Sequence, residues 1–118
     1  MIALEHEGRR VRLAALGEFS LDDFTEFEEF LLDNNLLQGG VDLLCDLTQM
    51  ADITIDAALE EIRFTRTHGD HFRRIAVVTS DGLLAWITWL ERLFTPADVA
   101  VFDSVEEAAA WLDEEDGA

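Results

Sequence analysis

The chain has 118 residues, 49% of them hydrophobic, which is enough to bury a core as one domain, residues 1–118, without disulfides. Twenty-six acidic residues face eight arginines and no lysine, and the net charge of −18 argues against binding to nucleic acid or anionic membranes. No apolar run approaches the roughly 20 residues that cross a bilayer, and the first residues lack the pattern of a signal peptide.

The acidity has two explanations that composition does not separate. One is a high-salt cytoplasm, because at 1 M salt the Debye length falls to about 3 Å and self-repulsion is screened. The other is an arginine-biased genome and a merely acidic protein.

Cys45 lies in an apolar run without a second cysteine, so we expect a buried, inert thiol and a cytoplasmic location.

The first third of the chain predicts a hairpin and a helix. Strands over Ile2–Glu5 and Arg10–Leu16 are joined by a turn at Glu7-Gly8. Ser20 is a typical N-cap, and the helix that follows ends at Asn34-Asn35. Its core stripe is expected to contain Leu21, Phe24, Phe27 and Leu31.

The middle third predicts a strand, a helix and a second strand. Val41–Leu47 is the third strand, and a helix over Thr54–His68 ends at Gly69. The stretch Phe72–Ser80 contains an unbroken apolar run, which is typical of a strand covered on both faces, so we predict that it is the central strand. The residues of the helix at core spacing are Ile55, Ala58, Leu59 and Ile62.

The last third predicts a helix over Leu83–Phe94, a strand over Asp98–Phe102 and a final helix. Ser104, with Glu107 three residues later, forms a capping box for that helix. Its expected core face contains Val105, Ala108, Ala109 and Leu112. The order β-β-α-β-α-β-α-β-α predicts a single α/β domain with a mainly parallel five-stranded sheet and an antiparallel first strand.

This order, with its motifs, resembles the SpoIIAA-like family of small STAS-type domains. Four pieces carry the resemblance: the apolar strand Leu43–Leu47, the helical stretch Ala57–Phe64, the strand Phe72–Val78, and Phe102 with the helical stretch Glu106–Leu112. The resemblance implies successive β/α units related to STAS and lipid-carrying CRAL-TRIO domains. It also implies a binding protein rather than an enzyme, with proposals of membrane association and an apolar ligand.

The related anti-sigma-factor antagonists are switched by phosphorylation of a serine in an Asp-Ser-Ser/Thr-Gly motif after the third strand. Here that place reads Asp46–Ala51, without the serine or the glycine. Thr48 and Thr54 supply nearby hydroxyls, but Thr54 is better explained as an N-cap. The departure argues against a phosphorylation switch.

The predicted helix Leu83–Phe94 is the first candidate site. At about 100° per residue its apolar side chains cover roughly 200° of arc, more than packing on one sheet requires. The surplus can be covered by a second subunit, an apolar ligand or a membrane surface. The candidate ligand or membrane contacts are Leu83, Leu84, Trp86, Ile87, Trp89, Leu90 and Phe94.

The basic stretch from residue 63 to residue 74 is the second candidate, as a site for a phosphate or carboxylate group. Its arginines are Arg63, Arg66, Arg73 and Arg74. Helix-dipole compensation and pairing with acids are the alternative roles. His68, Asp70 and His71 lie close in sequence but are a weak metal signal, so we predict no metal and no cofactor.

A third set of candidate site residues lies where parallel strands end, which is the usual place for ligands in such sheets. Its members are Asp46, Thr48, Thr79, Ser80, Asp81, Asp103 and Ser104, and most have the pattern of ordinary caps and turns. No nucleophile–base arrangement or phosphate loop is present, so no catalytic residue is predicted.

The sequence favours a non-enzymatic, homodimeric protein that binds an apolar or amphipathic molecule with reversible membrane contact. The alternative is a STAS-type regulatory module that binds a partner protein.

Overall fold

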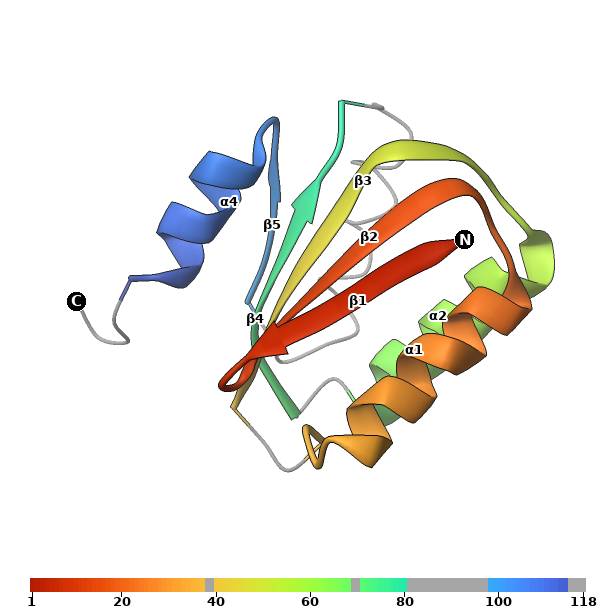
Figure 1. Ribbon diagram of the computed structural model, residues 1–118, viewed down its shortest axis with the longest axis horizontal. Coiled ribbons are helices and arrows are strands. Elements are labelled where there is room, and N and C mark those ends of the chain that lie inside the picture. Colours follow the sequence, from red (N-terminus) through yellow and green to blue (C-terminus); the bar gives the residue numbers. More distant parts are fainter. Residues whose placement is uncertain (38–39, 69–70, 81–97, 115–118) are drawn as a thin grey trace.

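Five strands form one sheet, and helices pack on both of its faces (Figure 1). The computed structural model describes residues 1–37, 40–68, 71–80 and 98–114, and only the backbone of residues 65, 66 and 68. The described elements are β1 (Ile2–Glu7), β2 (Arg10–Phe19), α1 (Leu21–Asp33), β3 (Val41–Ile53), α2 (Ile55–His68), β4 (Phe72–Val78), β5 (Asp98–Phe102) and α4 (Val105–Leu112).

The strands lie side by side in chain order, β1-β2-β3-β4-β5. β1 is antiparallel to β2, and every other neighbouring pair is parallel. This confirms the predicted α/β class and the mainly parallel sheet. The run expected to be the central strand is an inner strand, β4, whereas the middle of the sheet is β3. The predicted helix Leu83–Phe94 lies outside the described residues.

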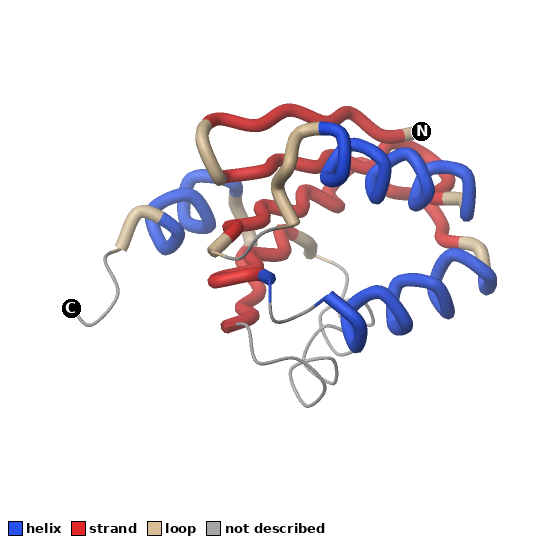
Figure 2. Tube along the Cα trace, turned by 90° about the horizontal axis from the view of Figure 1, so that it is seen from below, coloured by secondary structure: helices blue, strands red, loops and turns tan. Residues whose placement is uncertain are grey.

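The two faces of the sheet are covered unequally. α1 and α2 lie on one side and the short α4 lies on the other, as Figures 1 and 2 show. The larger core lies between the sheet and the first two helices. The smaller core joins Leu44, Ala76 and Val78 of the sheet to Ala108 and Leu112 of α4, which confirms the core face predicted for that helix.

Four phenylalanine rings form the centre of the larger core. Phe64 of α2 has its ring centroid 5.5 Å from that of Phe24, 5.8 Å from that of Phe27 and 6.1 Å from that of Phe72. Each of these side chains is buried. Aromatic pairs at such distances stabilise a core beyond the area that they bury.

The predicted core face of α2 is wrong. Ile55 is 81% exposed, Leu59 63% and Ile62 39%, whereas Ala57 and Phe64 on the opposite side of the helix are buried. The helix carries apolar residues on two opposite sides, Ile55, Leu59 and Ile62 on one and Ala57 and Phe64 on the other, and a helix packed on a sheet buries only one side. The stripe with Phe64 is buried because its ring completes the aromatic cluster.

The start of α1 is fixed by its cap. The Ser20 hydroxyl accepts from the Asp23 amide, and the Asp23 carboxylate accepts from the Ser20 amide and from the Met1 ammonium at 2.9 Å. Burial acts to raise the pKa of Asp23, but these hydrogen bonds outweigh it and hold that pKa below its ordinary value. The carboxylate therefore stabilises the fold above the unfolded pKa, and this contribution is lost as the pH falls through the lowered folded value. Leu21, expected in the core stripe, is 37% exposed, while Phe24, Phe27 and Leu31 are buried as predicted.

β3 is longer than the predicted Val41–Leu47 and continues to Ile53. From the Ala14–Asp46 pair to the Leu16–Gln49 pair, β2 advances by two residues and β3 by three, which marks a bulge in β3. A bulge interrupts the two-residue alternation, so the polar end of this strand carries no strand pattern in the sequence.

Replacing Phe64 by alanine should lower the free energy of unfolding by about 3–5 kcal/mol, because it leaves a cavity in the aromatic cluster. Replacing the exposed Leu59 of the same helix should change it by no more than about 0.5 kcal/mol. Urea unfolding of both variants measures the difference. Equal losses would show that α2 faces the sheet with the other stripe.

Candidate functional site

Charged side chains form one row across the face of the sheet that carries α4. Glu7 pairs with Arg10, Arg10 with Asp42, Asp42 with Arg74, and Arg74 with Asp98 as Cα partners in neighbouring strands. Paired residues share a face, and neighbouring strands lie about 4.8 Å apart. The charges alternate along the row, so each side chain lies beside an opposite charge.

A bulge in β4 places a third arginine, Arg73, beside this row. Val41 pairs with Phe72 and Asp42 pairs with Arg74, so β4 advances by two residues while β3 advances by one, and Arg73 is the extra residue. Bulges re-aim side chains next to them. Consecutive residues of a regular strand point to opposite faces, but here Arg73 and Arg74 both bind groups at the end of α4.

Arg73 holds Asp42 through two hydrogen bonds, Nε to Oδ1 at 2.8 Å and Nη2 to Oδ2 at 2.6 Å. Both side chains are mostly buried, with 25% and 12% of their surface exposed. The same Nη2 donates to the carbonyl of Leu112 at 2.9 Å. This bidentate geometry is the strong form of the arginine–carboxylate pair.

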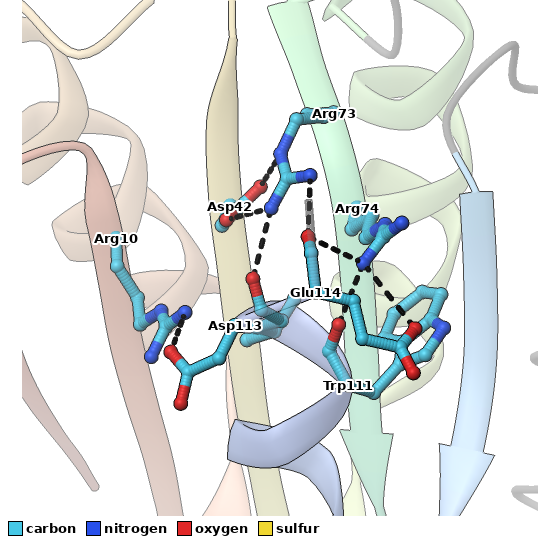
Figure 3. A network of polar contacts seen from close by, with 8 residues as sticks. Arg10, Asp42, Arg73, Arg74, Trp111, Asp113 and Glu114 are labelled. Carbon is cyan, nitrogen blue, oxygen red and sulfur yellow. Dashed lines mark hydrogen bonds and ion pairs between the residues drawn. The ribbon is translucent and has the colours of Figure 1, made fainter. Parts of the chain in front are cut away.

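Arg74 completes the cap of α4, as Figure 3 shows. Its Nη1 donates to the carbonyl of Trp111 at 2.6 Å and to that of Glu114 at 3.1 Å, and its guanidinium carbon lies 5.2 Å from the centre of the Trp111 ring. The last turn of α4 contains no basic residue. The negative end of its dipole is therefore compensated by arginines of the sheet.

Arg10 contacts α4 at its outer end and borders a depression. Its Nη2 donates to Asp113 Oδ1 at 2.7 Å. The depression beside it has a volume of about 360 Å³ and is lined by Glu7, Arg9, Arg10, Gly40 and Asp42. Arg9 and Arg10 are not among the predicted candidates, although with Arg12 they form a second basic stretch, and their neighbours in this site come from β3, from β4 and from the segment after α4.

The four predicted anion-binding arginines do not form one patch. Arg63 lies on α2, on the other side of the sheet from α4, and its side chain is 78% exposed beside Glu60 at 3.5 Å. The side chain of Arg66 lies outside the described residues. Arg73 and Arg74 are engaged with Asp42 and with the end of α4. Anion binding by these four residues stays a prediction.

The predicted contacts for a ligand or membrane all lie outside the described residues. They are Leu83, Leu84, Trp86, Ile87, Trp89, Leu90 and Phe94. Within the described residues, the largest exposed apolar group at regular helical spacing is the outer face of α2, formed by Ile55, Leu59 and Ile62. The sequence pattern identified these three residues but assigned them to the core.

Asp46 and Thr48 occupy the place of the phosphorylation motif in the related antagonists. The Thr48 hydroxyl donates to Asp46 Oδ1 at 2.6 Å, and the Thr48 amide donates to the same oxygen at 3.0 Å. Both residues belong to β3, which continues to Ile53 here. The hydroxyl is thus engaged with a carboxylate inside a strand.

Two of the other predicted strand-end residues, Thr79 and Ser104, have ordinary structural roles, and Asp81 lies outside the described residues. Ser104 caps α4 by accepting from the Glu107 amide at 3.2 Å, and the Thr79 amide donates to the carbonyl of Phe102 at 3.1 Å.

Cys45 is half-buried rather than fully buried. Across residues 1–37, 40–68, 71–80 and 98–114, no group of three or more His, Cys, Asp or Glu side chains is placed to hold a metal ion. None of the described helices is long and apolar enough to span a membrane.

Replacing Arg73 by glutamine should lower the free energy of unfolding by about 1.5–3 kcal/mol, because the mostly buried Asp42 loses its charged hydrogen-bond partner. Arg63→Gln is the matched control, since its exposed pair with Glu60 contributes little, and it should cost less than about 0.5 kcal/mol. Chemical denaturation at one pH compares the two variants. A loss in Arg73→Gln no larger than in the control would contradict the role given to this pair.

Comparisons with known proteins identify the family and the fold. The SpoIIAA-like family model matches residues 10–113. The structure is similar to an uncharacterized protein of the DUF3478 family with a SpoIIAA-like fold from Shewanella loihica PV-4, with a TM-score of 0.76 and 24% identity over 95% of this chain and 92% of that one. It is also similar to the anti-sigma factor antagonist SpoIIAA in its unphosphorylated form, with a TM-score of 0.59 and 13% identity over 95% and 96% of the two chains.

The sequence matches none of the curated proteins with which it was compared. At these identities the two structural likenesses show the fold, while the family model covers most of the chain, including β2 to α4. The predicted resemblance is confirmed, and the chain belongs to the SpoIIAA-like family.

Proposed function

We propose that this chain is a non-enzymatic regulatory module of the cytoplasm that binds a partner protein through the outer face of α2. The observation that carries the proposal is the exposure of Ile55, Leu59 and Ile62, which lie on one side of the helix at intervals of four and three residues. The side chains that anchor α2 to the sheet lie opposite. An exposed apolar stripe with this spacing suits recognition by a groove or a second helix.

The fold supports a protein as the ligand. One structure similar to this chain is that of an anti-sigma factor antagonist, a name that describes action on another protein. The serine that is phosphorylated in such antagonists is missing here, and Asp46–Ala51 lies within β3. The proposed module therefore acts without that phosphorylation.

The net charge of the chain indicates the charge of the partner surface that it would bind. With a net charge of −18, this surface repels acidic proteins and attracts basic ones. On α2 the exposed Asp56 lies beside the apolar stripe, and the exposed Arg63 pairs with Glu60 at 3.5 Å. We expect an apolar patch on the partner that is bordered by lysine or arginine, because complementary charge raises the association rate and excludes wrong partners.

Replacing Ile55 and Leu59 together by serine should weaken partner binding at least about tenfold without unfolding the protein, since both side chains are exposed. Leu32→Ser is the matched control, because Leu32 is 61% exposed but lies on α1. A partner captured by the wild-type protein is purified, and its dissociation constant for each variant is measured by titration calorimetry. Equal affinity of the two variants would place the binding surface elsewhere.

A second candidate function is binding of an apolar or amphipathic molecule, with reversible membrane contact, beside the predicted helix Leu83–Phe94. The wide apolar arc of that stretch favours it. Replacing Trp86 and Trp89 together by alanine should abolish retention of a small molecule in native mass spectrometry, while Ile55→Ser/Leu59→Ser should retain it. A homodimer of the wild-type protein without added mass would show instead that the apolar surface closes on a second copy.

A further inference from the structure

Arg10 lies between two possible partners, the end of α4 and an open depression. On one side it donates to Asp113 at 2.7 Å. On the other it lines the depression of about 360 Å³ together with Glu7, Arg9, Gly40 and Asp42. A side chain with 32% of its surface exposed has freedom to turn from one to the other.

Asp113 is a weak partner for this arginine. Its side chain is 69% exposed, so water already solvates the carboxylate, and an exposed ion pair contributes little. It is also the C-cap of α4, where a negative charge opposes the helix dipole. Releasing Asp113 from Arg10 therefore costs little, and the cap made by Arg73 and Arg74 does not depend on it.

The depression is lined by two arginines, Arg9 and Arg10, and by two acidic residues, Glu7 and Asp42, and it borders open space. Arg9 donates to a neutral group, the carbonyl of Leu36, at 3.0 Å. The charge of Asp42 is matched by the bidentate contact with Arg73. At Gly40, no atom lies within 4 Å of the position that a Cβ would occupy, so the backbone there borders open space.

We propose that Arg9 and Arg10 form a binding site for a phosphate group in this depression, and that the phosphate and Asp113 compete for Arg10. A phosphate has three strong acceptor oxygens and a charge near −2, so it can accept from both guanidinium groups, whereas Asp113 accepts from Arg10 through one oxygen. Binding releases the outer contact of α4 while its inner contacts remain. Arg10 lies on the face of the sheet that carries α4, and no residue that lines the depression belongs to α2, so the site is separate from the proposed partner surface.

The experiment uses the ¹⁵N-labelled full chain and two probes, inorganic phosphate and glycerol 3-phosphate, at constant ionic strength set with KCl. The wild-type protein should show saturable shifts at the Arg9 and Arg10 side chains, at the Gly40 amide and at the Asp113 amide. Saturation by inorganic phosphate alone identifies free phosphate as the ligand, and saturation by both probes identifies a phosphomonoester. Shifts that do not saturate with either probe would overturn the proposal.

Two variants test the competition. Asp113→Asn removes the competing charge and should tighten binding at least about threefold, whereas Glu106→Gln makes the same charge change at the other end of α4 and should leave affinity unchanged. Arg10→Gln should weaken binding at least about tenfold, with its fold checked by urea unfolding, and Arg63→Gln should not. Equal affinities of Asp113→Asn and Glu106→Gln would show that Asp113 does not compete, and would overturn the proposal.

Discussion

One extra residue in β4, Arg73, sets which side chains of this strand point to each face of the sheet. Without the bulge at Arg73, Phe72 would share a face with Arg74 and Ala76, because side chains alternate along a strand. With the bulge, Phe72 joins the aromatic cluster under α2 while Arg73 and Arg74 both reach the end of α4. The same residue then holds Asp42 through two hydrogen bonds. The larger core and the attachment of α4 thus both depend on this irregularity.

The order of elements could be predicted from the sequence because the signals for it are local. Glycines, the caps at Ser20 and Ser104, and the apolar run of β4 each act over a few residues. The orientation of α2 could not be predicted, because Ile55, Leu59 and Ile62 form as regular a stripe as the buried one. The choice between the stripes depends on contacts of Phe64 with rings more than 30 residues away in sequence. Periodicity describes a helix but not the surface that it meets.

The charged row shows why sites on sheets are hard to find in one sequence. Its five members come from five strands, and only the pairing register places them side by side. The predicted anion candidates Arg73 and Arg74 were selected for their local basicity, which is real, but their partners at Asp42 and at the end of α4 are distant in sequence. Arg9 and Arg10 carry the same local signal, together with Arg12, but basicity alone does not identify their partners. They gain their position beside Gly40 and Asp113 only when the sheet forms.

The distribution of charge separates two surfaces on this acidic chain. Arginines of β2 and β4 gather where α4 ends, because carbonyls without helical partners and two acidic residues meet there. The outer face of α2 lies across the sheet, where the exposed apolar groups are accompanied by Asp56 and by the ion pair of Arg63 with Glu60. The two helices are linked through one peptide of β4, since Phe72 packs against Phe64 on the buried side of α2 and the next residue, Arg73, binds the end of α4. A movement of α4 that displaces Arg73 would therefore also shift the neighbouring Phe72. Phe72 packs in the aromatic cluster beneath α2, and the close packing of that core opposes such a shift.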